Sequence, residues 1–173
     1  MLRIVFLLAF TLFAGVFAPA AEPWRAASQS ELRQIIPTRA QVEKERIETE
    51  FRTASGITDG KKFFAGVVLI TAGYAAEGKY SNFLIAQVPV KIGTLTLEPG
   101  TYVFGWKHKG EDALEVNFYE AESAKPLGSV EAKRTSRTGR IESFHITPPG
   151  ENGQIQIGRF AMSYELVKPL TQE

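Results

Sequence analysis

The residues best suited to metal chemistry are the two histidines, His108 and His145, because the chain contains no cysteine. A zinc site needs about three or four protein ligands, usually with at least two of them close together in the sequence. With Glu111 or Asp112, His108 offers two ligands from one predicted loop, but the chain has no His-x-His or His-x-x-x-His pair. The ligand spacing therefore predicts neither a metal site nor another cofactor.

Nucleophilic catalysis is the second chemistry to consider, since Ser143 stands two positions before His145. Alternation places both residues on the same face of a predicted strand over residues 140–147. A serine nucleophile is commonly presented by a Gly-x-Ser-x-Gly turn, and the chain has none. We therefore predict no catalytic residue and keep, as an alternative, a hydrolase that uses His108 or His145.

A basic run covers residues 133–140 and carries Lys133, Arg134, Arg137 and Arg140. An arginine side chain presents a planar fork that suits phosphate or sulfate. The run has no interleaved aromatic residue, and the formal charge of the whole chain is only +1, so we predict no nucleic-acid partner. The favoured interpretation is a hairpin loop whose charges keep a neighbouring sheet edge from pairing.

Aromatic residues give the leading hypothesis for a ligand site. Tyr74 and Tyr80 flank a glycine-containing loop, whereas Trp106 and His108 lie near the end of a predicted strand. If these ends converge, the rings and nearby polar groups would form the mouth of a small pocket. We therefore predict these four residues as ligand-binding.

The sequence over residues 91–109 predicts a hairpin around Pro99-Gly100. Proline sets φ for the first turn position and glycine supplies a positive φ at the second. In this register Leu97 faces Tyr102, and the other predicted pairs are Leu95 with Phe104, Gly93 with Trp106, and Lys91 with His108. The large apolar residues then share one face, so we expect Tyr102 and Phe104 in the core.

Further strands follow from apolar alternation and from turn residues between the runs. Residues 62–72 form a continuous apolar run, which predicts a strand buried on both faces. Ser55-Gly56 is typical of a connection, and a change of phase at Gly158 predicts a bulge. The pattern favours an all-β, single-domain antiparallel sandwich of eight or nine strands; the alternative is a small closed barrel.

The N-terminal residues predict export. Arg3, the apolar run 4–18 and the small residues of Ala18-Pro19-Ala20 are typical of a signal peptide, which we assign to residues 1–20. The apolar run is shorter than most membrane-spanning helices, so we predict no membrane span after cleavage. We expect the protein in the periplasm or outside the cell.

The remaining chain is divided into an arm, a domain and a tail. Residues 21–44 form the arm, which is either irregular or contains a short helix capped by Ser28 or Ser30 and stopped by Pro37. Residues 45–168 form the β domain, and residues 169–173 form a frayed tail. Without cysteines, the stability of an exported domain of this size must come from its core alone.

The unit Leu97-Glu98-Pro99-Gly100-Thr101-Tyr102 resembles a turn in small exported bacterial β-sandwich proteins of unknown function. The resemblance implies a fold and an exported location, and it carries no activity. Together with the missing catalytic motifs, it favours a non-catalytic binding or interaction module of the bacterial envelope, whose partner is an unknown protein or small molecule. The alternatives are a barrel that carries an apolar ligand and the hydrolase described above. The sequence predicts no oligomeric state.

Overall fold

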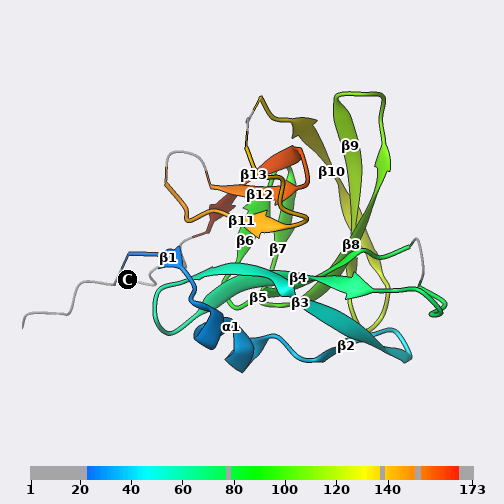
Figure 1. Ribbon diagram of the computed structural model, residues 1–173, viewed down its shortest axis with the longest axis horizontal. Coiled ribbons are helices and arrows are strands. Elements are labelled where there is room, and N and C mark those ends of the chain that lie inside the picture. The colour runs from blue at the N-terminus through cyan, green and yellow to red at the C-terminus, as the bar shows by residue number, and fades with distance from the viewer. Residues whose placement is uncertain (1–22, 77–78, 137–138, 151–152, 168–173) are drawn as a thin grey trace, which may run out of the picture.

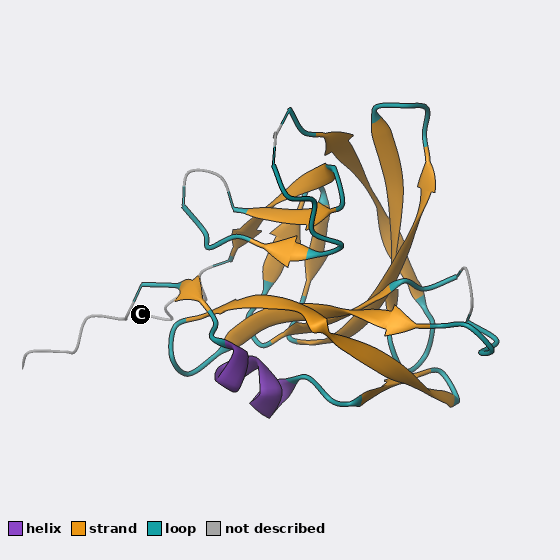
Figure 2. Cartoon of the chain, viewed as in Figure 1, coloured by secondary structure: helices purple, strands orange, loops and turns teal. Residues whose placement is uncertain are grey.

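The computed structural model describes residues 23–76, 79–136, 139–150 and 153–167. Within these ranges the regular structure is almost all strand, with one short helix (Figure 2). The predicted signal and the predicted tail lie outside the described residues. In chain order the elements are β1 (Arg25–Ala26), α1 (Gln29–Ile35), β2 (Arg39–Val42), β3 (Glu45–Thr58), β4 (Phe63–Ile70), β5 (Asn82–Ala86), β6 (Val90–Ile92), β7 (Leu95–Leu97), β8 (Gly100–His108), β9 (Ala113–Glu120), β10 (Pro126–Arg134), β11 (His145–Ile146), β12 (Gln154–Ile157) and β13 (Phe160–Leu166).

The strands form an antiparallel sheet that curls into a nearly closed barrel (Figure 1). Its main path runs β1-β3-β4-β5-β8-β9-β10-β13-β12-β11, while β2 pairs with β3, and β6 pairs with β13 and β7. The all-β prediction is confirmed, and the arrangement matches the barrel alternative better than an open sandwich. The described chain has thirteen strands rather than eight or nine. Strands of two or three residues, such as β1, β6, β7 and β11, are too short to show alternation in the sequence.

Apolar side chains fill the inside of the barrel. The ring of Phe104 lies between those of Phe118 and Phe144, with centroid distances of 5.2 and 6.2 Å. Phe144 also packs against Gly66, where an added Cβ would come within 2.8 Å of the ring. The other large members of this inner cluster are Ile57, Phe64, Leu84, Val90, Ile92, Leu97, Tyr102, Leu114, Val116, Ile146, Ile155, Ile157, Phe160, Met162 and Tyr164.

A second, outer cluster covers the other face of β3, β4, β5 and β8. Leu32 of α1 and Ile36, which is the C-cap of this helix, pack there together with apolar residues of β2. Strand β4 contributes to both clusters, since Phe64 belongs to the inner one and Val67 to the outer one. The predicted burial of residues 62–72 on both faces is therefore confirmed for the strand within that run.

The predicted pairing around Pro99 is wrong. Strand β7 pairs with β6, which places Leu97 opposite Val90, whereas β8 lies between β5 and β9, which places Tyr102 opposite Leu84. Two-residue hairpin loops favour turns with a positive φ at the first position, and the proline ring forbids that value. The chain therefore turns a corner at Pro99 and enters a different part of the sheet.

The faces of these strands were nevertheless predicted correctly. Leu97, Tyr102 and Phe104 all belong to the inner cluster, as the apolar alternation indicated. Gly100 does not have the positive φ that we expected. The corner is held instead by the Tyr102 hydroxyl, which donates to the backbone carbonyl of Glu98.

Two tight hairpins occur at glycines that the sequence analysis interpreted otherwise. Gly93 and Gly158 each have a φ of 58° and stand first in the two-residue loops β6–β7 and β12–β13. A positive φ at this position fits a type II′ turn, which matches the twist of the flanking strands. The predicted bulge at Gly158 is therefore wrong, because the chain reverses there.

Two other expectations fail where β3 approaches β11. Ser55-Gly56 lies inside β3, where Gly56 packs so closely on Ala65 that an added Cβ would come within 2.4 Å of the Ala65 Cβ. The predicted strand over residues 140–147 is reduced to the two residues of β11. In this region glycine serves close packing, and the polar residues before β11 form an irregular segment.

Candidate functional site at the barrel seam

One edge of β3 is covered at both ends and open in the middle. β1 pairs with Ile57 and Thr58, and β2 pairs with residues 45–48 on the same side of β3. Between β1 and β2 the chain leaves this edge as α1, so residues 50–55 have no paired strand there. We call the opening between this part of β3 and β11 the seam.

The residues around the N-terminus of α1 specify where the chain leaves the edge of β3 and becomes helical. Ser28 forms a capping box: its Oγ accepts from the Glu31 N–H at 3.3 Å, and the Glu31 carboxylate accepts from the Ser28 N–H at 2.8 Å. Arg25 donates to the same carboxylate at 2.7 Å and, with Ser28, lowers the pKa of Glu31 to about 2. Ile36, before Pro37, is already extended. The helical alternative for residues 21–44 is confirmed, and β1 and β2 add two strands to that segment.

An irregularity in β3 forms one wall of the seam. The register with β4 is interrupted between Glu50 and Ser55. Thr53 bridges the interruption, because its Oγ1 accepts from the Val68 N–H at 3.0 Å and donates to the Glu50 carbonyl at 2.8 Å. The regular β3–β4 ladder is therefore absent between Glu50 and Ser55, and polar side chains of this part of β3 line the seam.

Glu50 and Arg52 form an ion pair on this wall. The guanidinium of Arg52 donates to the two carboxylate oxygens of Glu50 at 3.0 and 3.1 Å. Arg52 lowers the pKa of the Glu50 carboxyl, and Glu50 raises the pKa of the guanidinium. Each group therefore stays charged at neutral pH and is neutralised by the other.

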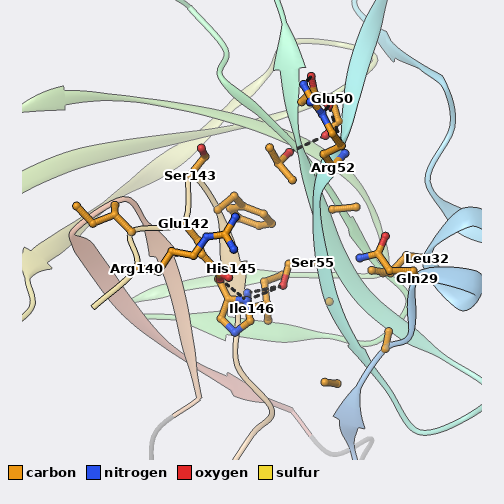
Figure 3. Close-up of a pocket in the computed structure, with 17 residues that line it drawn as sticks. Gln29, Leu32, Glu50, Arg52, Ser55, Arg140, Glu142, Ser143, His145 and Ile146 are labelled. Carbon is orange, nitrogen blue, oxygen red and sulfur yellow. Dashed lines mark hydrogen bonds and ion pairs between the residues drawn. The ribbon is translucent and has the colours of Figure 1, made fainter. Parts of the chain in front are cut away.

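A single serine joins the two sides of the seam (Figure 3). Ser55 Oγ accepts from the backbone N–H of Ile146 at 2.9 Å and lies 3.3 Å from His145 Nδ1. The same ring nitrogen lies 3.0 Å from a carboxylate oxygen of Glu142. In the described part of the chain, the hydrogen bonds between β3 and β11 all involve this hydroxyl, so a side chain takes the place of a ladder.

A cavity of about 680 Å³ occupies the seam. Its walls are residues 26–27, α1, Glu50 and residues 52–56 of β3, and residues 140–146. Arg140 extends from the last of these segments toward β3, as Figure 3 shows. A second cavity of about 330 Å³ shares residues 140–142 and His145 and is also lined by Gln156 and Arg159. We call the larger cavity the seam pocket.

The lining of the seam pocket includes polar side chains that have free hydrogen-bonding capacity in the described chain. Gln29 of α1 and Ser143 are exposed, and no side-chain hydrogen bond is described for either of them. Both can therefore bind a ligand without first losing a partner in the described chain. The volume of the pocket lies within the usual range for small-molecule sites, where placed polar groups fix the orientation of the ligand.

Ser55, His145 and Glu142 are the three residue types of a hydrolytic triad, but their geometry differs from one. In a triad the serine and the acid contact opposite nitrogens of the imidazole ring. Here both approach Nδ1, and Ser55 Oγ already accepts the N–H of Ile146. The arrangement is suited to holding β3 against β11, and it gives the serine no general base on a separate nitrogen.

Of the predicted ligand-binding residues, the two tyrosines lie in the outer cluster. Tyr80 is only 1% exposed, its hydroxyl donates to Glu43 at 2.7 Å, and burial raises its pKa. Its ring meets that of Tyr119 edge to face at 5.2 Å. Tyr74 is partly buried against the same cluster. Both side chains hold the loop before β5 against the sheet.

The other two predicted residues lie on β8. Trp106 is partly buried against the inner cluster, and His108 is exposed, with its ring 5.9 Å from that of Phe160. Tyr80 and Trp106 therefore lie on opposite faces of the sheet. None of the four predicted residues lines the seam pocket or the cavity beside it, so the structure does not bring them together in either one.

The basic run is divided between two places. Arg134 ends β10, donates to the Glu111 carbonyl and forms an ion pair with Asp112 at 3.1 Å. Arg140 lines the seam pocket, and Arg137 lies outside the described residues.

Among the described residues, no three His, Cys, Asp or Glu side chains gather as metal ligands. No helix in this part of the chain has the length and apolar character to cross a membrane.

Sequence reasoning found part of the seam pocket and missed the rest. Ser143 and His145 were considered together as candidates for catalysis, and Arg140 was considered separately as part of the basic run. Ser55 and Arg52 were missed, because Ser55-Gly56 looks like a turn and Arg52 looks like an outward strand position. The sequence feature that could have indicated this wall of the pocket is the group of polar residues within 52–55, ahead of an apolar run. That feature does not indicate which distant segment faces these residues across the pocket.

Comparison with known protein families, with characterised proteins and with solved structures gave no match to this chain.

Proposed function

We propose that this protein is an exported, non-catalytic binding module of the bacterial envelope and that it binds a small polar ligand in the seam pocket. The observation that carries the proposal is the pocket itself, which opens where α1 interrupts strand pairing along β3. The proposal of export to the periplasm or the cell exterior rests on residues 1–20 of the sequence.

The geometry favours a binding module over both alternatives. A carrier of an apolar ligand needs an empty barrel, whereas Phe104, Phe118 and Phe144 pack together inside this one. A hydrolase of the triad type needs a serine and an acid on opposite imidazole nitrogens, whereas Ser55 and Glu142 share one. The seam pocket requires neither property.

Thermal melting in the presence of small polar molecules tests the proposal. A panel of sugars, sugar acids, amino acids and dipeptides should contain at least one compound that raises the melting temperature of the purified protein. Ser143→Trp should abolish that shift, because Ser143 is exposed and lines the seam pocket. Ser136→Trp is the matched control, since Ser136 is exposed and lines neither described cavity.

Four results would overturn the proposal. One is a panel in which no compound shifts the melting temperature. Another is a shift that survives in the Ser143→Trp variant. The third is turnover of an ester, peptide or glycoside that disappears with Ser55→Ala or His145→Ala, which would establish the hydrolase instead. Native mass spectrometry that finds a retained lipid-sized mass would establish the carrier.

A further inference from the structure

We propose further that the ligand of the seam pocket is a small hydroxylated carboxylate of the sugar-acid type and that Arg140 binds its carboxylate. This inference rests on the proposed function, since it names the chemical class of ligand for the same pocket. It follows from the charges that line the pocket, from the polar groups around them and from the size of the cavity.

The ionisable side chains of the lining are those of Glu50, Arg52, Arg140, Glu142 and His145. Arg52 is paired with Glu50 through two hydrogen bonds, and Glu142 is paired with His145 at 3.0 Å. Arg140 also lines the pocket, but in the described part of the chain its guanidinium has no carboxylate or hydrogen-bond partner. It is therefore the cation in the lining that is available to an anionic ligand.

A single guanidinium selects among anions by shape and charge. Its planar fork matches a carboxylate through two parallel hydrogen bonds. A phosphate monoester carries close to two negative charges at neutral pH, and the pocket would offer it one unpaired cation beside Glu50 and Glu142. One ionised carboxylate therefore fits the lining better than a phosphate.

The rest of the lining suits hydroxyl groups. Gln29 and Ser143 provide neutral donors and acceptors, while the paired carboxylates of Glu50 and Glu142 retain lone pairs for ligand hydroxyls. An apolar acid would cover these groups without binding them, and buried polar groups without partners lower affinity. A cavity of about 680 Å³ lies within the usual range for small ligands and can accommodate a monosaccharide or a disaccharide.

Isothermal titration calorimetry with D-glucuronate and D-galacturonate tests the inference, with D-glucose, acetate and inorganic phosphate as comparison ligands. At least one of the sugar acids should bind more tightly than all three comparison ligands. Arg140→Gln should weaken its binding by about tenfold or more, because a charge-assisted hydrogen-bond pair is removed. Arg46→Gln should leave the affinity unchanged, since Arg46 is exposed and lines neither described cavity.

The outcomes separate this inference from the proposed function. Equal binding of glucose and glucuronate, equal binding of phosphate, or an unchanged affinity in Arg140→Gln would each overturn the ligand class. So would the absence of binding by both sugar acids. The proposed function would still stand in all these cases if another polar compound stabilised the parent protein and the Ser136→Trp variant, but not the Ser143→Trp variant.

Discussion

The barrel has a continuous side and a seam, and the two are held together by different interactions. On the continuous side, β4, β5 and β8 pair along their lengths and are buried on both faces. At the seam, β3 and β11 meet through the hydroxyl of Ser55. Apolar packing on two faces leaves no room for a ligand, whereas the incomplete pairing leaves a polar cavity. We therefore expect most of the stability to come from the continuous side, and we place the proposed ligand binding at the seam.

The largest expected effect comes from truncating a ring on the continuous side. Phe104 is fully buried on β8, so Phe104→Ala should lower the free energy of unfolding by about 3–5 kcal/mol. Phe144→Ala should cost less, because Phe144 lies in an irregular segment that can move into the space left by its ring. Urea denaturation of the two variants measures both costs. An equal or larger cost for Phe144→Ala would show that the seam is packed as firmly as the continuous side.

The second prediction concerns the hydroxyl that joins the seam. Ser55→Ala should cost about 1–3 kcal/mol, because it leaves the buried N–H of Ile146 without its partner. Hydrogen exchange at Ile146 should also become faster than in the parent protein. The control is Ser143→Ala, which changes an exposed hydroxyl of the same pocket and should have an effect within about 0.5 kcal/mol. Unchanged exchange at Ile146 in Ser55→Ala would mean that the seam is closed by other contacts.

The third prediction concerns a buried polar residue on the continuous side. Asn82 is fully buried, and neither side-chain amide atom has a partner in the described chain. Its neighbours across the ladder, Val68 and Phe104, pack in the inner cluster. Asn82→Leu should therefore stabilise the protein by about 1 kcal/mol, since a desolvated amide is replaced by an apolar group of similar size.

A matched substitution shows whether this interpretation of Asn82 is correct. Asn82→Asp should be strongly destabilising, because it places a charge among apolar side chains. Thermal or urea unfolding measures both variants. A loss of stability in Asn82→Leu would show that the amide binds a partner, such as a buried water molecule, inside the barrel.

The inward-facing positions of the strands were the part of the fold that the sequence predicted well. Alternation placed Leu97, Tyr102 and Phe104 on one face correctly, because burial depends on a local period of two residues. Their strand partners were not predictable in the same way, since Leu97 and Tyr102 turned out to belong to different strand pairs. Gly93 provides the real hairpin, and its positive φ leaves no distinct mark in a sequence with fifteen glycines.

The seam was largely hidden from sequence reasoning for a physical reason. Ser55 and Ile146 are ninety-one positions apart and meet only because the barrel almost closes. No short motif connects residues so distant in sequence. A single serine also does not change the composition of a segment enough to mark this contact. The capping box at Ser28 is local, and it was correctly considered as the start of a helix. What it could not reveal was the open edge that the helix leaves along β3.

The smallest expected effect lies at Glu43, which joins the outer side of the barrel to the loop before β5. Its carboxylate accepts from Lys79 Nζ at 2.8 Å and from the Tyr80 hydroxyl at 2.7 Å, and these two donors lower its pKa. A carboxyl whose pKa is lower in the folded state stabilises the protein above its unfolded pKa of about 4.3, and this contribution is lost as the pH falls through the folded pKa. Glu43→Gln should therefore cost less than about 1 kcal/mol at pH 7, because the side chain is 42% exposed and screened by solvent.

The pH dependence of unfolding tests this contribution. Between pH 5 and pH 3, taken as roughly the window around and below the unfolded pKa, the parent protein should lose more stability than Glu43→Gln, whose amide does not titrate. Lys79→Met removes the donor that contributes most to the lowered pKa of Glu43. In the Lys79→Met variant, glutamate and glutamine at position 43 should therefore differ less in the stability that is lost between these pH values. Parallel pH profiles for the parent and Glu43→Gln would mean that Lys79 and Tyr80 do not hold the carboxylate in solution. Glu43 has a φ of 52°, which disfavours a residue with a side chain, and its turn would then be held by the backbone alone, since its N–H donates to the Ala121 carbonyl at 2.8 Å and its carbonyl accepts from Gln41 Nε2 at 2.7 Å.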